Sequence, residues 1–228
     1  VFTDGYSTTA GLIINNSVFN FSLIKGYYPR SEPIILKSCT INNSTINSDS
    51  YNYGIKLYNS IVNGSSFTIG CCGSNFVIQD SYIYQSPFTD YNNYYDVTIN
   101  KSQLIESPLY LPSGDVNISK STIMFDETKT FNPPSNYHGS QPLNQMGLKT
   151  RKAIITQSIV SGKGNGTAIE IECNENFSSS ISNTLITNVA EGIKVTGSNG
   201  SYDFQNNNFI NNSSYALVNQ SNRSILGT

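Results

Sequence analysis

A six-residue pattern recurs nine times along the chain, and no other feature constrains its fold as strongly. Each copy has an apolar residue, two polar residues, a Ser, Thr or Asn anchor, any residue, and a second apolar residue. The copy at positions 41–46 reads Ile-Asn-Asn-Ser-Thr-Ile. The nine anchors are Ser17, Ser44, Ser60, Ser81, Ser102, Ser121, Ser158, Thr184 and Asn207.

The anchors recur with a unit of roughly 20–25 residues, which is typical of a solenoid. The longest interval, from Ser121 to Ser158, indicates an insertion. The positions five and three before the anchor, such as Phe76 and Ile78, alternate with polar residues, which indicates a half-buried strand. No window keeps a helical period, and Leu is too sparse for leucine-rich repeats. We therefore predict an all-β fold, a right-handed parallel β-helix of about nine to ten coils with loop insertions.

These nine copies are accompanied by second strands, Gly-Thr-Ala-Ile-Glu-Ile at 166–171 and Glu-Gly-Ile-Lys-Val at 191–195. With them the chain resembles the parallel β-helix superfamily, the pectin-lyase-like fold, over roughly residues 10–220. That superfamily includes lyases, hydrolases, phage tailspikes and surface adhesins, so the resemblance implies a fold and leaves the function open. In such a fold, coils stack about 4.8 Å apart and like side chains form ladders, with Ser, Thr and Asn bonding the corner backbone and each other.

Composition narrows the choice of partners. Charged residues make up 12% of the chain, and the net charge is −2. Asn and Ser number 30 and 33, a content that would suggest disorder without the regular apolar columns. The low charge and scattered Lys argue against binding to nucleic acid or to an anionic membrane. We find no signal peptide and no apolar run long enough to predict direct membrane insertion of this fragment.

We expect one β-helix domain over residues 1–228, decorated by loops near 26–33, 86–95 and 126–152. The chain opens at Val1 without Met, and no polar cap follows the last repeat. An uncapped coil exposes an unpaired strand edge. We therefore expect the chain to be a fragment of a larger extracellular protein.

Four cysteines are present. Cys39 and Cys173 fall in inward columns and are expected about five coils apart, too far for a disulfide. At most one bridge is expected, joining Cys39 to Cys71 or Cys72, or linking Cys71 to Cys72. One His and no Cys-x-x-Cys motif give no reason to expect a metal site, and we expect no cofactor.

An enzymatic function is the runner-up. Polygalacturonases of the superfamily use Asn-Thr-Asp, Asp-Asp, Gly-His-Gly and Arg-x-Lys in that order. This chain has Thr3-Asp4-Gly5, His138-Gly139 and Arg151-Lys152, but it lacks the Asp-Asp pair and both flanking residues. We assign no catalytic residue. A polysaccharide lyase or hydrolase stays as the alternative, and a phage tailspike-type host-glycan binding protein as a further one.

Two strands carry glutamates that we expect to point outward on the same side. These are Glu170 and Glu172, with Glu191 expected to stack one coil further on. Such a group is either a carboxylate patch for a cation or sugar, or an ordinary solvated face. The ordinary solvated face is the simpler interpretation.

Tyrosine favours recognition, because its ring gives a large contact area with a polar tip. Tyr82 and Tyr84 should lie on the surface on either side of an inward Ile83. We expect the loop tyrosines to contact a partner, and we expect replacement of Tyr94 and Tyr95 by Ala to abolish binding without unfolding the helix. The predicted partner-binding residues are Tyr91, Tyr94, Tyr95, Tyr137, Tyr27 and Tyr28.

Fourteen Asn-x-Ser/Thr sequons are present, although the repeat itself writes Asn-Asn-Ser at corners. The favoured function is a secreted or cell-surface adhesion module, a glycoprotein that binds a surface protein or glycan without catalysis. Self-association is a further option. The predicted glycosylation sites are Asn20, Asn63, Asn165, Asn176, Asn199 and Asn212.

Overall fold

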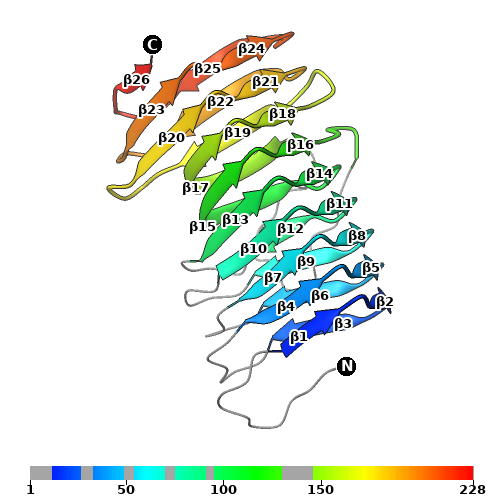
Figure 1. Cartoon of the computed structure of the whole chain (residues 1–228). Helices are drawn as coiled ribbons and strands as arrows, with labels where there is room; N and C mark the ends of the chain where they lie inside the picture. Colours follow the sequence, from blue (N-terminus) through cyan, green and yellow to red (C-terminus); the bar gives the residue numbers. More distant parts are fainter. Residues whose placement is uncertain are drawn as a thin grey trace.

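A computed structural model describes residues 12–26, 33–48, 54–69, 75–90, 95–129 and 146–227, and these form a parallel β-solenoid (Figure 1). Its 26 strands wind around one axis, and strands of successive coils pair in parallel. The described residues contain no helix, so none of them forms a helix that could cross a membrane. The predicted all-β parallel β-helix is confirmed.

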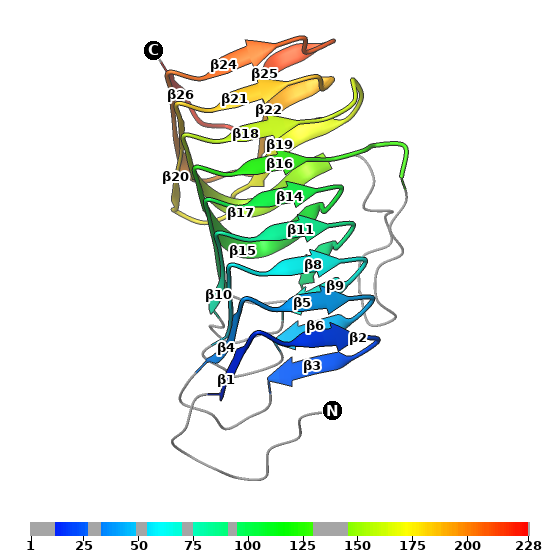
Figure 2. The ribbon, with the colours of Figure 1, turned by 45° about the vertical axis from the view of Figure 1, so that its right-hand side comes forward.

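The solenoid has three faces, each built from one strand per coil. Face 2 is a separate sheet of nine short strands, stacked one above the other in Figure 2. It consists of β2 (Val18–Asn20), β5 (Thr40–Asn42), β8 (Ile61–Asn63), β11 (Tyr82–Tyr84), β14 (Gln103–Ile105), β16 (Thr122–Met124), β18 (Ile159–Ser161), β21 (Leu185–Thr187) and β24 (Asn208–Ile210).

Faces 1 and 3 together form a single sheet of 17 strands, because two long strands run through the corner between them. These are β15 (Leu109–Ser119) and β17 (Met146–Thr156), whose mutual register shifts between Leu111 and Asp115. Face 1 also contains β1 (Leu12–Asn15), β4 (Ile34–Lys37), β7 (Ile55–Tyr58), β10 (Asn75–Gln79), β13 (Asp96–Asn100), β20 (Ser178–Ser182), β23 (Ser201–Gln205) and β26 (Ile225–Gly227). Face 3 also contains β3 (Leu23–Gly26), β6 (Thr45–Ser48), β9 (Ser66–Ile69), β12 (Phe88–Asp90), β19 (Thr167–Glu172), β22 (Glu191–Thr196) and β25 (Tyr215–Asn219).

The number of turns is slightly lower than predicted. Nine strands of face 2 are separated by eight full turns, against the nine to ten coils expected. The predicted second strands at 166–171 and 191–195 are confirmed as β19 and β22, which pair in parallel.

The anchor of the second coil is Cys39, and the assignment to Ser44 was wrong. In the register, Ile14 pairs with Leu36 and Phe19 with Ile41, so Cys39 follows Ser17. With this change the first two intervals, from Ser17 to Cys39 and from Cys39 to Ser60, become nearly equal in length. The error arose because Asn43-Ser44, which follow β5 at the second corner, repeat the polar residue and Ser found at most first corners.

The core is a set of apolar columns that run the length of the solenoid. The middle residue of each face 2 strand points inward, and from Phe19 to Ile186 these residues are at most 9% exposed. Aromatic rings fill part of the core, where Phe67 stacks on Phe88 with 4.0 Å between ring centroids. Burial of each such side chain contributes about 1.5–3 kcal/mol relative to exposure.

Two predicted loop boundaries were wrong. Residues 86–90 are part of the solenoid, since Ser86 and Phe88 are completely buried and β12 pairs with β9. The predicted loop at 126–152 ends early, because β17 begins at Met146. Ser86 is a buried corner residue like Ser65 and Ser107, but the tyrosine-rich sequence after it led to the prediction of a loop. Most of the loop predicted at 26–33 lies outside the described residues.

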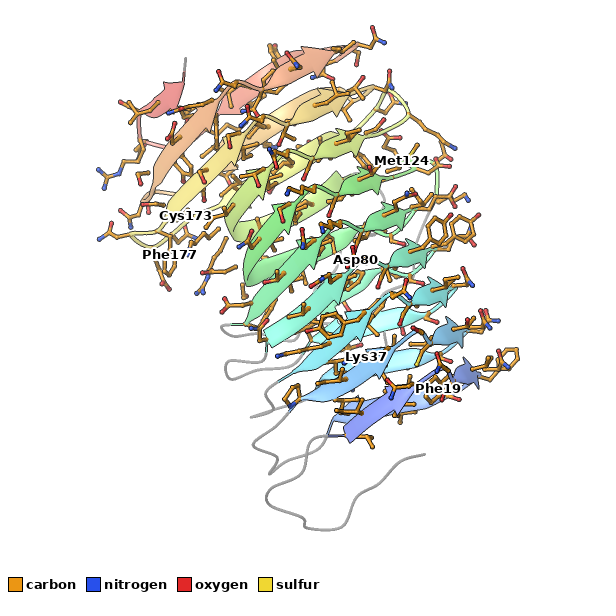
Figure 3. The ribbon with its side chains drawn as sticks, in the orientation of Figure 1. Phe19, Lys37, Asp80, Met124, Cys173 and Phe177 are labelled. Carbon is orange, nitrogen blue, oxygen red and sulfur yellow. The ribbon has the colours of Figure 1, made fainter. Side chains whose placement is uncertain are left out.

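Cys39 and Cys173 are buried and free, as expected of small core residues. The Cys39 thiol donates to the carbonyl oxygens of Lys37 and Ile14, so it takes the place of an anchor hydroxyl. Cys173 is the first residue and Phe177 the last residue of the connection between β19 and β20 (both labelled in Figure 3). The predicted alternatives for a bridge that involve Cys71 and Cys72 lie outside the described residues.

Candidate binding surface

Face 2 owes its short strands to two tight corners. The residue before each anchor of the first corner, between faces 1 and 2, has a positive φ in all nine coils, from Asn16 to Asn206. This left-handed conformation is unusual for residues other than Gly and is most common for Asn and Asp. A second left-handed residue follows seven of the nine strands, such as Gln85 after β11. These strands are thus kept short between two sharp bends.

The anchor hydroxyls hold these corners in place from one coil to the next. The Ser81 hydroxyl donates to the Gln79 carbonyl oxygen at 2.8 Å and accepts the Ser60 N–H at 3.1 Å. A second ladder runs along the corner between faces 2 and 3, at Ser22, Ser44, Ser65, Ser86 and Ser107. The predicted hydrogen bonding of polar residues at the corners is confirmed. The first ladder runs from Cys39 to Ser158 and the second from Ser22 to Ser107, so together they hold the first seven strands of face 2 in one register.

Face 2 contains no charged residue. Its nine strands include no Asp, Glu, Lys or Arg, although such residues make up 12% of the chain. The first and third residues of each strand point outward, in two rows. Charged residues are usually the most exposed type in a protein, so an outward-facing sheet without any is unusual.

Large apolar side chains are exposed on this face. Tyr82 and Tyr84 lie outward beside the buried Ile83, as predicted, and Tyr82 is 39% exposed. Contiguous exposed apolar surface in a soluble protein commonly marks an interaction site. The other exposed residues are Val18 at 65%, Ile61 at 46%, Met124 at 45% (labelled in Figure 3), Ile159 at 39% and Ile210 at 50%.

Polar side chains on face 2 are uncharged and ordered. The Asn42 Nδ2 donates to Asn20 Oδ1 at 2.8 Å, and the Asn63 Nδ2 donates to Asn42 Oδ1 at 3.0 Å.

On the other outward row, a hollow of about 420 Å³ lies over Ile61, Tyr82 and the first corner. Its other lining residues are Asn59, Ser60, Asp80, Ser81, Lys101 and Gln103.

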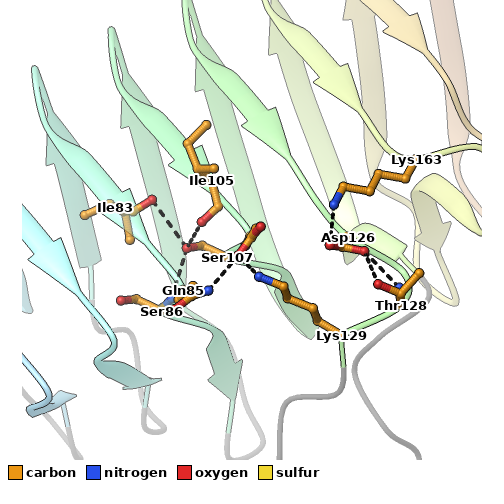
Figure 4. A network of polar contacts seen from close by, with 10 residues as sticks. Ile83, Gln85, Ser86, Ile105, Ser107, Asp126, Thr128, Lys129 and Lys163 are labelled. Carbon is orange, nitrogen blue, oxygen red and sulfur yellow. Dashed lines mark hydrogen bonds and ion pairs between the residues drawn. The ribbon is translucent and has the colours of Figure 1, made fainter.

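The second corner changes where residues 130–145 follow β16. Asp126 takes the anchor position, and its carboxylate accepts hydrogen bonds from the Thr128 N–H and hydroxyl and from Lys163 Nζ at 2.5 Å (Figure 4). Lys163 and Thr128 lower the pKa of Asp126 to about 2. Both oxygens of the buried Glu127 accept the Lys163 N–H at 3.0 Å.

A second ion pair extends this network toward the earlier coils. Glu106 accepts hydrogen bonds from Gln85 and Lys129, both of which are labelled in Figure 4. Burial alone would raise the pKa of Glu106, but Lys129 and Gln85 lower it overall. These contacts hold the chain at the point where it leaves the regular coil, so we interpret the network as structural.

Face 3 carries charged residues in pairs. Glu170 and Glu172 point outward on one side, as predicted, and Lys149 Nζ lies 2.9 Å from a carboxylate oxygen of each. The Lys149 ammonium neutralises much of the expected carboxylate patch. The predicted stacking of Glu191 was wrong, because Lys194 lies beside Glu170 in the register and Glu191 accepts the Thr167 hydroxyl.

Face 1 contains the arrangement closest to an enzyme site. Asp96 and Asp115 are neighbours on β13 and β15, and Asp115 accepts hydrogen bonds from Arg151 at 2.8 Å and Lys152 at 3.1 Å. A hollow of about 220 Å³ lies over them. The side chains of Arg151 and Lys152 also lie against the Phe177 ring.

Of the predicted loop tyrosines, only Tyr95 is described, and its expected exposure was wrong. The ring is 2% exposed and packs over Gly114, where an added Cβ would come within 2.2 Å of it. A buried ring offers no contact surface, so Tyr95→Ala would test packing and could not test recognition alone. Tyr27, Tyr28, Tyr91, Tyr94 and Tyr137 lie outside the described residues.

The predicted glycosylation sites differ in access. Asn165 and Asn176 are exposed, whereas Asn20 and Asn63 belong to the ladder on face 2. The Asn199 Nδ2 donates to the Asn174 carbonyl oxygen. The amide of Asn212 is buried without a partner among the described residues, which argues against it as an acceptor. Glycosylation itself stays a prediction.

Sequence reasoning missed face 2 as a site, although its signal was present. The positions one and three after each corrected anchor are uncharged in all nine copies. Comparison with protein-family models and with curated protein sequences finds no match for this chain. The case for a function therefore depends on the geometry and chemistry of the faces.

Proposed function

We propose that this protein is a recognition and adhesion module that binds another surface through face 2, without catalysis. One observation carries the proposal: nine registered strands contain no charged residue and expose several large apolar side chains. Protein interfaces lose charged residues at their centre and gain aromatic residues and Met, as face 2 does with Tyr82, Tyr84 and Met124.

The regular backbone supports this role physically. Face 2 has no register shift in any of its strand pairs, and the serine ladders hold the corners on both sides of it from β5 to β14. A surface that is already ordered loses little conformational entropy when a partner binds. We place this module outside the cell or on its surface, in line with its many sequons and its resemblance to adhesins of pectin-lyase-like fold.

Adhesion of coated beads to cells of the source organism tests the proposal. Beads coated with the purified chain should bind these cells, and the double variant Ile61→Ala with Tyr82→Ala should lose most of that binding while keeping its circular dichroism spectrum. A matched control replaces Thr98 and Asn117 by Ala, on the outward side of face 1. Equal binding by both variants would show that face 2 is not the contact surface.

The alternative is a polysaccharide lyase or hydrolase, favoured by Asp96 and Asp115 beside two basic residues. Paired carboxylates are the usual catalytic groups in glycoside hydrolysis. Loss of polysaccharide from coated beads, abolished by Asp96→Asn, would support this alternative over recognition. Against it, Asp115 is already held by two cations, Arg151 and Lys152.

A further inference from the structure

We infer that the partner of face 2 is a second copy of this chain, packed face to face across a two-fold axis. The inference rests on the proposed function, because it names the occupant of the same surface. A charged group of a partner, buried against the strands of face 2, would have no opposite charge to pair with. Its burial would strongly destabilise the complex. Face 2 of another copy is itself free of charge over all nine strands.

Most soluble homo-oligomers are closed dimers in which the same patch is used twice. For face 2, one such axis runs parallel to the strands through the central strand, β14. Each strand then faces the strand equally far from β14 on its other side, and the two solenoids run antiparallel. Residues of one outward row face the same row of the partner.

This arrangement brings like residues together around the axis. Apolar residues face each other in the pairs Ile61 with Ile159, Tyr84 with Met124, and Ile105 with its own copy. Uncharged polar residues face each other in the pairs Asn42 with Thr187, Asn63 with Ser161, and Gln103 with its own copy. One mixed pair, Tyr82 with Thr122, lies next to the axis, and the other mixed pairs fall toward the two ends: Val18 with Asn208, Thr40 with Leu185, and Asn20 with Ile210.

The other two-fold axis, parallel to the solenoid, fits much less well. Each strand would then face its own copy, with its first residue against the third. That places an apolar side chain against a polar one in seven of the nine strands, for example Ile159 against Ser161. The sequence of face 2 therefore favours the antiparallel dimer.

Charged residues at the first corner also favour the antiparallel dimer. The left-handed corner residues follow the same antiparallel correspondence, so Asp80 faces Lys120 twice, once on each side of the axis. Both side chains are exposed, and neither forms an ion pair within the described part of the chain. Lys101 faces its own copy between them. Opposite charges at an interface rim mainly fix orientation and raise the association rate.

The area is sufficient for a specific dimer. Nine strands at about 4.8 Å spacing and about five residues of width, corners included, give a surface of roughly 600 Å² per copy. A specific interface buries about 800 Å² per partner, and crystal contacts mostly bury less than about 400 Å² per partner. Face 2 exceeds the second value and approaches the first.

Sedimentation equilibrium of the whole chain over a range of concentrations gives the first test. The unsubstituted chain should be a dimer, and Ile61→Lys should make it a monomer because two charges would enter the interface. Thr98→Lys, which puts the same side chain on face 1, should remain dimeric. Thermal unfolding followed by circular dichroism checks that both variants are folded.

A charge exchange tests the orientation with two exposed residues, at corner positions where the chain already has both Asp and Lys. Asp80→Lys and Lys120→Asp should each weaken the dimer several-fold, and the double variant should restore it. Lys101→Gln should strengthen the dimer, since it removes the like-charge pair. Weakening by the single variants without restoration in the double variant would overturn the antiparallel arrangement.

Crosslinking locates the axis directly. Face-to-face sheets lie about 10 Å apart, beyond the reach of a disulfide, so the probe is a bis-maleimide of about that length. Gln103→Cys should give a crosslinked dimer above the background of the unsubstituted chain, and Thr40→Cys should not. Crosslinking of Thr40→Cys in preference to Gln103→Cys would contradict an axis at β14.

The outcomes separate this inference from the proposed function. A chain that is monomeric at all concentrations, yet binds cells through face 2, overturns the dimer and leaves the recognition module intact. A dimer unaffected by Ile61→Lys and by the charge exchange also overturns the inference. A chain that binds neither cells nor itself overturns both.

Discussion

Face 2 and face 3 are built from the same coils but present very different surfaces. Face 2 has no charged residue on nine strands, whereas face 3 exposes an ion-paired group around Lys149, Glu170 and Glu172. Their inward columns are alike, since Leu104 on face 2 and Ile169 on face 3 are both fully buried. The comparison teaches that the inward positions determine the fold and the outward positions are free to acquire a function.

The largest contrast should separate neighbouring residues of one strand. Leu104→Ala removes a fully buried side chain and should lower the free energy of unfolding by about 2–5 kcal/mol. Gln103→Ala, one residue earlier on the exposed row, should change it by no more than about 0.5 kcal/mol. Urea unfolding followed by circular dichroism measures both. Similar losses in the two variants would contradict the claim that the inward residues, and not the outward ones, stabilise the fold.

The corner ladder should be the next most sensitive feature. Ser81→Ala leaves the Ser60 N–H and the Gln79 carbonyl oxygen without their side-chain partner, which should cost about 1–3 kcal/mol. Thr122→Ala, on the outward row of face 2, is the control and should have little effect. Urea unfolding compares the midpoint of each variant with that of the unsubstituted chain. An unchanged midpoint for Ser81→Ala would refute the structural role of the ladder.

The charged group of face 3 should contribute less. Burial alone would lower the pKa of Lys149, but Glu170 and Glu172 raise it overall. Lys149→Met should lower the free energy of unfolding by about 1 kcal/mol, and the loss should shrink in high salt. Met keeps the unbranched stem as far as Cε and removes the ammonium group, so the variant tests chiefly the charge. A loss independent of salt would point to packing in place of ion pairing.

The smallest effect is expected from acid. The pKa of Asp126 is about 2 in the folded chain, below its ordinary value of 3.8, so its carboxylate stabilises the fold above pH 3.8. That contribution is lost as the pH falls from about 4 to 2, because the unfolded chain takes up the proton first. The melting temperature of Asp126→Asn should therefore fall less over this window than that of the unsubstituted chain. Parallel curves for the two chains would exclude Asp126 as a source of the pH dependence.

Much of the fold could be predicted from the sequence because the solenoid repeats local rules. An apolar column with period two and a polar anchor indicated the strands, and both are properties of short segments. The anchor of the second coil was predicted at Ser44 in place of Cys39. Cys39 forms the hydrogen bond of an anchor but does not match the polar pattern, whereas Ser44 matches the pattern at the other corner.

Long-range packing explains what the sequence could not reveal. Burial of Tyr95 depends on Gly114, which leaves room for its ring on the next coil, and no local pattern relates these residues. The pairing of Lys149 with two glutamates one coil away likewise depends on the register. The uncharged rows of face 2 could be read from the sequence, because the positions one and three after each anchor are uncharged in all nine copies.

The most direct test of the central claim compares a lysine placed on each face. Ile159→Lys alters the exposed row of face 2, and Thr98→Lys makes the matched change on face 1, so both add one positive charge. Adhesion of coated beads to source cells and to chain-coated beads should be lost for Ile159→Lys and kept for Thr98→Lys. Equal adhesion by the two variants would contradict the assignment of face 2 as the binding surface.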